Sequence, residues 1–183
     1  MKVLIVNGSP RKNGSSSFVS DKIREKYSEN GNEGDLLFLN ELNFKGCQGC
    51  LSCRKHNSFC VVADELHDIL PKVVAYDAIV IVSPNYYGFV TGQLKLFLDR
   101  WYCLKDRERR SKFKENTKLF FIITQGSPNR DHAQNVINWG KKIFESFNLK
   151  FFSYTIPGCA TENTDMAQMK FSELNTHLNM FLS

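Results

Sequence analysis

Four of the six cysteines lie close together, in the pattern Cys47-x2-Cys50-x2-Cys53-x6-Cys60. Thiolates two residues apart can bind one metal centre, and the cysteine run of bacterial ferredoxins begins with the same spacing. A [4Fe-4S] cluster on these four cysteines is one interpretation of the pattern. A structural zinc site, with His56 as a further ligand, is a second, and free thiols that pack a loop are a third. The spacing leaves all three open.

A polar loop follows the first apolar run of the chain and leads into a helical pattern. Its sequence is Asn7-Gly8-Ser9-Pro10-Arg11-Lys12-Asn13-Gly14-Ser15-Ser16-Ser17. A helix start exposes unpaired N–H groups and the positive end of the helix dipole, and serine hydroxyls and Arg11 can add donors to phosphate oxygens. The loop lacks the glycine patterns of nucleoside triphosphatases and of dinucleotide folds, so we expect a monophosphate ligand. A polar turn with a serine helix cap is the structural alternative.

Five short β-rich runs position these loops, at residues 2–6, 36–39, 78–82, 119–124 and 151–156. Their nearly continuous hydrophobicity indicates a parallel sheet that is covered on both faces. Because helical patterns separate the runs, we predict an α/β fold with a doubly wound five-stranded parallel sheet of order 2-1-3-4-5. Such a sheet binds its ligand at the carboxyl ends of the strands.

The segments between the strands repeat apolar residues at helical spacing. The stripes are Val19, Ile23 and Tyr27; Leu94, Phe97, Leu98 and Trp101; Val136, Gly140, Ile143 and Phe147; and Ala167, Phe171, Leu174, Leu178 and Phe181. A weaker helix is predicted at about residues 64–74, and we expect a kink or a break there because Pro71 removes a hydrogen bond. Asp165 is a candidate cap of the last helix.

No internal repeat, linker or low-complexity tract divides the chain, so we predict a single domain over residues 1–183. The shares of hydrophobic residues (42%) and charged residues (23%) are those of ordinary globular proteins, which argues against disorder. Residues 40–60 and 102–116 are long for connections in a compact domain, so we expect them to be functional.

A second loop follows the third predicted strand, where a doubly wound sheet places its ligand. With the helix after it, the loop reads Ser83-Pro84-Asn85-Tyr86-Tyr87-Gly88-Phe89-Val90-Thr91-Gly92-Gln93-Leu94-Lys95-Leu96-Phe97-Leu98-Asp99-Arg100-Trp101. Together with the motif Gly8-Ser9-Pro10-Arg11-Lys12-Asn13-Gly14, this segment resembles the NAD(P)H-dependent FMN reductase family of flavodoxin-like proteins. The resemblance spans nearly the whole chain.

The resemblance implies a single flavodoxin-like domain that binds FMN. It places the FMN phosphate at Ser9, Arg11, Asn13, Ser15, Ser16 and Ser17, and the flavin ring against Pro84, Asn85, Tyr86, Tyr87 and Gly88. In relatives the loop after the fourth strand completes the flavin pocket, and from it we carry over Gly126 and Ser127. A flavin ring needs a flat contact surface and a close approach of the backbone, which suits these residue types.

Within this family, iron-sulfur flavoproteins carry a cysteine arrangement similar to the one seen here. Cysteine loops followed by an acidic pair, here Asp64-Glu65, also look like those of relatives that act with FMN alone. In that case we expect free thiols that pack a loop near the flavin. Relatives commonly bind the flavin at a subunit interface, so the resemblance implies a homodimer or higher homo-oligomer. Lys95, Asp99 and Arg100 are then candidates for the surface or the dimer face.

The formal charge of +5 is concentrated at residues 105–114, where Phe113 is the single aromatic residue among the cations. Nucleic-acid binding normally interleaves aromatic with basic residues, so we do not expect it. The longest apolar stretches, 73–82 and 119–123, are shorter than the roughly 18 residues of a membrane span. The apolar start of the chain is too short for a signal peptide, so we expect a cytoplasmic protein.

We therefore expect an oxidoreductase in which NADH or NADPH reduces FMN and a small acceptor then collects the electrons. Candidate acceptors are a quinone, a nitro or azo compound, or a free flavin. Because the flavin carries the chemistry, we assign no catalytic acid or base. The alternative is an iron-sulfur flavoprotein that exchanges electrons with a ferredoxin-like partner on the basic segment. The acceptor, the choice between NADH and NADPH, and the content of the cysteine loop stay open.

Overall fold

Five parallel strands form one sheet in the computed structural model, in the order β2-β1-β3-β4-β5. The strands are β1 (Lys2–Asn7), β2 (Glu33–Phe38), β3 (Ala78–Pro84), β4 (Lys118–Thr124) and β5 (Lys150–Ile156). The structure describes residues 1–29, 31, 33–160 and 163–182. The strand order and the parallel pairing confirm the predicted doubly wound sheet.

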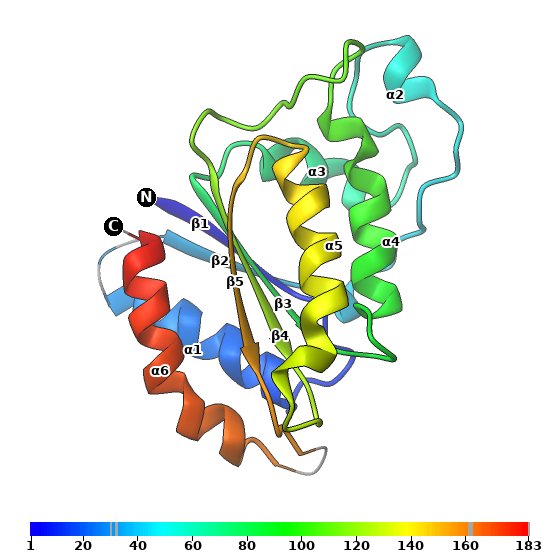
Figure 1. The fold of residues 1–183 in the computed structure, drawn as a ribbon. Helices are drawn as coiled ribbons and strands as arrows, with labels where there is room; N and C mark the ends of the chain where they lie inside the picture. The colour runs from blue at the N-terminus through cyan, green and yellow to red at the C-terminus, as the bar shows by residue number, and fades with distance from the viewer. Residues whose placement is uncertain (30, 32, 161–162, 183) are drawn as a thin grey trace.

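Helices cover both faces of this sheet (Figure 1). One face packs against α1 (Ser15–Glu29) and α6 (Asp165–Leu182), and the other against α3 (Leu66–Val73), α4 (Gly92–Arg100) and α5 (Gln134–Glu145). Successive residues of a strand point to opposite faces. In β1, Val3 and Ile5 therefore join the core under α1 and α6, whereas Leu4 and Val6 join the core under the other three helices.

Two sequence-based expectations about helix ends are wrong in detail. Helix α3 continues through Pro71 to Val73 without a break, and Pro71 lies so near the end of the helix that few later residues depend on it. Asp165 is the first residue of α6 rather than its cap. The side-chain oxygen of Asn163 accepts a hydrogen bond from the Asp165 N–H at 3.3 Å, so Asn163 supplies the contact that a cap provides.

Trp101 is the centre of an aromatic cluster at the end of α4 and is almost fully buried. Its ring lies 5.3–5.8 Å, between centroids, from the rings of Phe97, Phe113, Phe144 and Phe147. The cluster joins α4 to α5 and to the segment before β4. Because Trp101 is already covered inside the chain, it offers no surface to a second subunit.

The two long connections of the chain pack against each other, on the far side of the molecule from the carboxyl ends of the strands (Figure 1). The first contains the short helix α2 (Ser52–Lys55), and the second begins with the 3-10 helix η2 (Trp101–Leu104). Arg54 donates to the backbone oxygen of Asp106, and the Arg107 N–H donates to the side-chain oxygen of Asn57 at 3.2 Å.

No helix among the described residues is both long enough and apolar enough to cross a membrane.

We predict that Gly140→Ala destabilises the protein, although alanine is the better helix former. A Cβ atom at Gly140 would lie 2.7 and 2.8 Å from two ring carbons of Phe121, because α5 packs directly on β4 at this point. Overpacking of this kind costs about 1–3 kcal/mol, which exceeds the roughly 1 kcal/mol gained in helix propensity. Urea denaturation followed by circular dichroism measures the change in the free energy of unfolding.

The matched control is Gly92→Ala in the first turn of α4, where no heavy atom lies within 4 Å of the added Cβ. We expect this variant to be as stable as the parent protein or more so. Equal stability gains in both variants would contradict the close packing of α5 on β4.

Candidate functional site

A cavity of about 140 Å³ opens where the loops after four of the strands meet, at the carboxyl end of the sheet. Seven of the predicted site residues line it, namely Arg11, Ser15, Ser16, Pro84, Asn85, Tyr86 and Gly126. Four residues that the sequence did not single out also line it, namely Thr124, Gln125, Cys159 and Ala160. The predicted residues Ser9, Asn13, Ser17, Tyr87, Gly88 and Ser127 do not form part of its lining.

The loop after β1 is shaped by its own side chains. The Asn7 side-chain oxygen accepts from the Ser9 N–H at 2.9 Å, and its amide nitrogen donates to Ser17 Oγ at 2.8 Å. Ser17 Oγ in turn donates to the Arg11 carbonyl at 2.6 Å, and Ser9 Oγ accepts from the Arg11 N–H at 3.1 Å. Ser9 and Ser17 therefore hold the curve of the loop rather than face the cavity.

The start of α1 leaves one hydroxyl for a ligand. Ser15 Oγ is buried and has no oxygen or nitrogen partner among the described residues, whereas Ser16 Oγ is bonded to Thr124 Oγ1 at 2.8 Å. Burial raises the pKa of the neighbouring Cys159 thiol, and a weak hydrogen bond from the Ser15 hydroxyl to this sulfur opposes that rise. A buried hydroxyl without a strong acceptor costs about 1–3 kcal/mol, so an anionic oxygen beside Ser15 would be favourable. Arg11 and the first N–H groups of α1 make the same position suitable for phosphate.

The loop after β3 turns sharply beside this cavity. Tyr86 and Phe89 exchange backbone hydrogen bonds of 2.8 and 3.0 Å, and Tyr87 and Gly88 between them have positive φ angles of 52° and 79°. Positive φ at both central residues is typical of a type I′ turn. The turn points the Tyr87 side chain fully into solvent and keeps Tyr86 at the cavity.

Gln125 connects the loops that follow the last three strands. Its side-chain oxygen accepts from Asn85 Nδ2 at 3.1 Å, and its own amide nitrogen donates to the carbonyls of Ser127 and Asn129. Its backbone carbonyl accepts from the Cys159 N–H at 2.8 Å. Asn85 Oδ1, buried at this junction, has no partner among the described residues. The position directly after a buried strand, here β4 and β5, is the sequence signal that would have found Gln125 and Cys159.

The loops after β1 and β3 are held together by close backbone contacts. Thr91 Oγ1 donates to the Gly8 carbonyl at 2.6 Å and accepts from the Leu94 N–H, so it caps α4 and binds the first loop at once. A Cβ atom at Gly8 would lie 2.9 Å from the Cβ of Leu94. Only glycine allows this approach of the first loop to α4.

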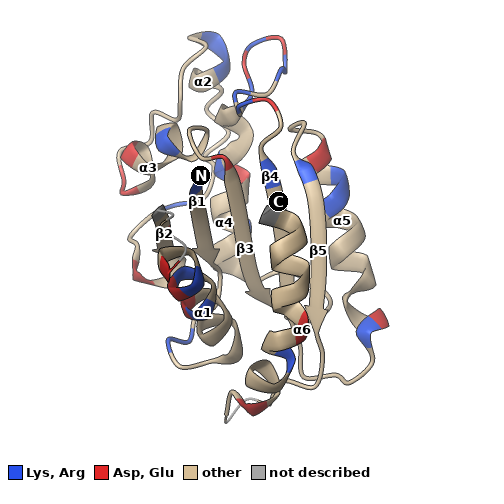
Figure 2. Cartoon of the chain, turned by 90° about the vertical axis from the view of Figure 1, so that its left-hand side faces the viewer, with Lys and Arg blue, Asp and Glu red and all other residues tan. Residues whose placement is uncertain are grey.

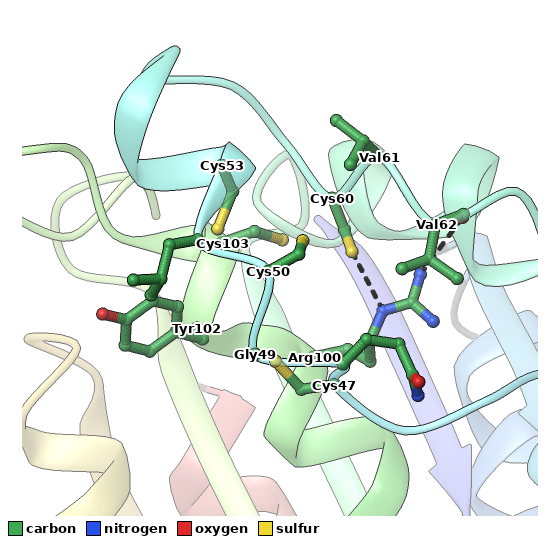
Figure 3. A pocket seen from close by; sticks show the side chains of 12 residues that line it. Cys47, Gly49, Cys50, Cys53, Cys60, Val61, Val62, Arg100, Tyr102 and Cys103 are labelled. Atoms are coloured by element: carbon green, nitrogen blue, oxygen red, sulfur yellow. Dashed lines mark hydrogen bonds between the residues drawn. The ribbon is translucent and has the colours of Figure 1, made fainter.

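A second cavity, of about 290 Å³, contains the four motif cysteines (Figure 3). Cys47, Cys50, Cys53 and Cys60 all line it, and Cys103, from η2, lines it too. No pair among these cysteines is disulfide-bonded. Sequence spacing did not link Cys103 to the motif cysteines, because they lie more than forty residues earlier in the chain. The four thiols lie on the opposite side of the molecule from the first cavity, not beside it as the interpretation of thiols near the flavin expects (Figure 1).

The pKa shifts of three of these cysteines differ in direction. Hydrogen bonds from Ser52 lower the pKa of Cys50, whereas burial raises the pKa of Cys53 and raises the pKa of Cys103 to about 12. Cys103 is therefore a neutral thiol at physiological pH. No three His, Cys, Asp or Glu side chains in the described part of the chain are gathered closely enough to hold a single metal ion. Four thiols opening onto one cavity nevertheless match the donor set of an iron-sulfur cluster.

Arg100 holds the cysteine loop to the end of α4 and is buried, so its assignment to the surface is wrong. Its guanidinium donates to both carboxylate oxygens of Asp64, at 2.7 and 3.1 Å, and to the Lys45 carbonyl at 2.8 Å. Its Nε–H donates to the Cys60 sulfur at 3.1 Å (Figure 3). Lys95 and Asp99, by contrast, form an exposed pair of 2.6 Å on the same helix.

Asp64 completes this link on its own side. It accepts from the Lys45 N–H and the Leu66 N–H, both at 3.1 Å, so one carboxylate fixes the chain before and after the cysteines. Burial raises the pKa of Asp64, but the hydrogen bonds from Arg100 and Lys45 outweigh burial and hold this pKa below its ordinary value.

We predict that Asp64→Asn lowers the free energy of unfolding by about 3 kcal/mol at neutral pH, because it leaves the Arg100 charge buried without its partner. Since the folded pKa of Asp64 is depressed, the stabilisation is present above the ordinary aspartate pKa. It is lost as pH falls through the folded value. In urea denaturation, the free energy of unfolding of the variant should therefore fall less between pH 7 and pH 3 than that of the parent protein.

Asp99→Asn is the control, because it breaks the exposed Lys95–Asp99 ion pair on α4, where Asp99 directly precedes Arg100. Such pairs contribute about 0–1 kcal/mol, so this variant should behave like the parent protein. Equal effects of the two substitutions would refute the role of the Arg100–Asp64 pair.

Comparison with known proteins places the chain in a family. Residues 1–154 match the family model described as NADPH-dependent FMN reductase. An iron-sulfur flavoprotein of Archaeoglobus fulgidus is 33% identical over 130 residues, which cover 70% of this chain and 61% of that protein. The match thus spans about three fifths of the relative's length.

Two solved structures with 15–17% identity share the fold. An FMN-dependent NADH-azoreductase from Bacillus anthracis has a TM-score of 0.75, with all of both chains covered. An NAD(P)H:quinone oxidoreductase from Methanothermobacter marburgensis has a TM-score of 0.72, with 94% of this chain and 92% of that chain covered. These results confirm the flavodoxin-like fold and the resemblance carried by the two loops. The chain belongs to the NADPH-dependent FMN reductase family.

Proposed function

We propose that this protein is an FMN-dependent oxidoreductase that takes electrons from NADH or NADPH and passes them to a small acceptor. The observation that carries the proposal is the buried Ser15 hydroxyl, which has no oxygen or nitrogen partner among the described residues, in a cavity that Arg11 also lines. Family membership over residues 1–154 supports the same cofactor.

The FMN phosphate would be held at the start of α1. Ser15 Oγ and the first N–H groups of the helix supply neutral donors, and Arg11 supplies a positive charge. Three other side chains of this loop would not contact the phosphate themselves. They hold the loop in the curve that presents these donors, and they are Asn7, Ser9 and Ser17. Ser16 is committed to Thr124 and ties the helix to β4.

The flavin ring would lie against Pro84, Asn85 and Tyr86, with Gly126 on the side of β4. Asn85 Oδ1 is a buried acceptor with no partner in the described part of the chain, and the edge of a flavin carries an N–H donor suited to it. Bound FMN supplies the hydride and electron chemistry itself. The side chains that line the cavity bind and orient the ring, so we assign none of them to proton transfer.

A quinone, a nitro or azo compound, or a free flavin is the acceptor that we propose. The rings of Tyr86 and Tyr87 are exposed at the rim of the cavity, where a planar molecule can stack on them. The fold shared with an azoreductase and a quinone oxidoreductase supports this class of acceptor.

We propose that two copies of the chain form a homodimer and that the protein works in the cytoplasm. The exposed Tyr87 beside the cavity is the apolar surface that a second copy would cover. Six free cysteines suit a reducing compartment.

We predict that Ser15→Ala weakens FMN binding about tenfold, the effect expected when one hydrogen bond to a charged group is lost. The free energy of unfolding of the FMN-free protein should not fall, because the substitution removes a buried polar atom without a partner. Titration with FMN, followed by quenching of flavin fluorescence, measures the affinity. Oxidation of NADPH by the FMN-saturated parent protein, with a quinone as acceptor, tests turnover.

Ser20→Ala is the control on the same helix. Ser20 is fully buried and donates to the Ser16 carbonyl, one turn away from the cavity lining. We expect it to leave the FMN affinity unchanged. Failure of the parent protein to bind added FMN would overturn the proposed function. If Ser15→Ala binds FMN as tightly as the parent protein does, the phosphate does not bind at Ser15.

A second candidate function is electron transfer by an iron-sulfur flavoprotein, with a [4Fe-4S] cluster on Cys47, Cys50, Cys53 and Cys60. The shared cavity of the four thiols and the likeness to a relative named iron-sulfur flavoprotein support it. A ferredoxin-like protein is the partner that we propose, and the cations of residues 105–114 would attract its acidic surface.

We predict that protein purified without oxygen contains about four irons per chain, the content of such a cluster, and absorbs broadly near 400 nm beside the flavin bands. Replacing any one of the four motif cysteines with serine should lower the iron content strongly. Cys103→Ser is the control, because Cys103 lines the same cavity but lies outside the motif. Flavin bands with negligible iron, even after reconstitution with iron and sulfide, would leave the cysteines as free thiols.

A further inference from the structure

A separate cavity of about 300 Å³ lies next to the cysteine pocket, between α4, α5 and the segment after α4. Five apolar or aromatic side chains form much of its wall, namely Leu98, Tyr102, Trp139, Ile143 and Phe147. Tyr102 also lines the cysteine pocket and is labelled there in Figure 3, so the two cavities share this side chain. The volume is at the lower end of the range for small-molecule sites, about 300–1,000 Å³.

The same cavity is lined by an excess of positive charge. Its cations are Arg54, Lys95, Lys105 and Arg109, and its single carboxylate is Asp99, which Lys95 already pairs with at 2.6 Å. Among the residues that the structure describes, the other three cations form no ion pair. Figure 2 shows the blue of Lys and Arg on α2 and on the neighbouring loop at this end of the molecule.

Two of these cations lie over aromatic rings. The Arg54 guanidinium carbon is 4.5 Å from the centroid of the Tyr102 ring, and Lys105 Nζ is 4.5 Å from the centroid of the Phe147 ring. Lys105 also donates to the hydroxyl of Ser146 at 3.1 Å. Neutral rings and hydroxyls position these cations without cancelling their charge.

The electrostatics at Lys105 confirm that the charge is uncompensated. Burial lowers its pKa, and the nearby charges of Arg109 and Arg54 lower it further. Asp106 does not relieve them, because its carboxylate accepts from the Arg110 N–H and Nε–H, both at 2.7 Å, and is not part of the cavity lining.

Arg109 has an unfavourable backbone conformation at this cavity. Its φ angle of 67° lies in the left-handed region, which arginine adopts under strain and glycine adopts freely. The turn it occupies would close equally well with glycine. What the arginine adds is a cation at the cavity, the third there besides Lys95, which is paired with Asp99.

We infer that this cavity binds a small planar aromatic molecule that carries a carboxylate or sulfonate group. Its ring would lie among Tyr102, Trp139 and Phe147, and its anionic group would meet Lys105 and Arg109. The inference does not depend on the flavin, because none of these residues lines the flavin cavity. With the cysteine pocket the group shares Tyr102 alone.

Calorimetric titration of the purified protein, with excess FMN present, tests this inference. The probe is 2-naphthoate, and 2-naphthamide is its uncharged counterpart. We expect naphthoate to bind at least tenfold more tightly than naphthamide. Arg109→Gly and Lys105→Met should each weaken naphthoate binding about tenfold, the effect of losing one hydrogen bond to a charged group. Arg109→Gly also relieves the backbone strain, so misfolding would not explain its loss of binding.

Arg107→Met is the matched control, because Arg107 is an exposed cation of the same loop that does not line the cavity. It should bind naphthoate like the parent protein. Equal binding of naphthoate and naphthamide, or unchanged affinity in Arg109→Gly and Lys105→Met, would overturn the inference. An equal loss of naphthoate affinity in Arg107→Met, Arg109→Gly and Lys105→Met would indicate general charge attraction. That result would also overturn the inference.

The location of the probe can be read from the two tryptophans. Trp139 lines the cavity, whereas Trp101 is buried in the aromatic core. In a nitrogen-15 NMR spectrum, with the indole signals assigned through Trp139→Phe, naphthoate should shift the Trp139 signal far more than that of Trp101. A shift in flavin absorbance without a shift at Trp139 would place the probe in the flavin cavity and refute the proposed site.

Discussion

Burial of the parallel sheet on both faces is the constraint on which the rest of this structure depends. Residues such as Val3 and Leu4 alternate between two cores, so neither face of β1 can carry a polar group along its length. In the three central strands, β1, β3 and β4, polar side chains appear only at or near the strand ends, as with Asn7, the last residue of β1, and Gln125, the residue after β4. Because all five strands are parallel, these ends meet at one edge and build one cavity there.

The opposite end of the molecule follows a different principle. The cysteine loop contains one short helix and is held largely by side chains, above all by the buried pair of Arg100 and Asp64. Burying a guanidinium is unfavourable unless it is fully paired, and here every contact of Arg100 is made to the cysteine loop or to Asp64. The loop geometry and the charge of Arg100 therefore depend on each other.

Patterns with a single physical cause were predictable from the sequence. Continuous apolar runs predicted the strands, and the alternation of strands with helices predicted their order. Position in the loops after the strands identified Ser15, Asn85 and Tyr86 as residues of the cavity. Features that need contacts across long sequence separations were not predictable. Arg100 looked like a surface cation because its partner Asp64 lies 36 residues away, and Cys103 had no motif to join it to the other cysteines.

Local hydrogen bonds explain the remaining differences within the first loop. Ser9 and Ser17 have the same hydroxyl as Ser15, and composition alone could not say which of them faces a ligand. The structure separates them by their hydrogen bonds. Ser9 Oγ accepts from the Arg11 N–H, and Ser17 Oγ accepts from Asn7 Nδ2 and donates to the Arg11 carbonyl. Ser15 Oγ has no oxygen or nitrogen partner among the described residues. The same comparison could not be made before the loop was seen in three dimensions.

The most direct test of the central claim is a crystal structure of the protein with FMN. The account predicts the FMN phosphate at the start of α1, within hydrogen-bond distance of Ser15 Oγ and beside Arg11, and the ring against Pro84, Asn85 and Tyr86. FMN bound at another surface, or an empty cavity in crystals grown with excess FMN, would contradict it.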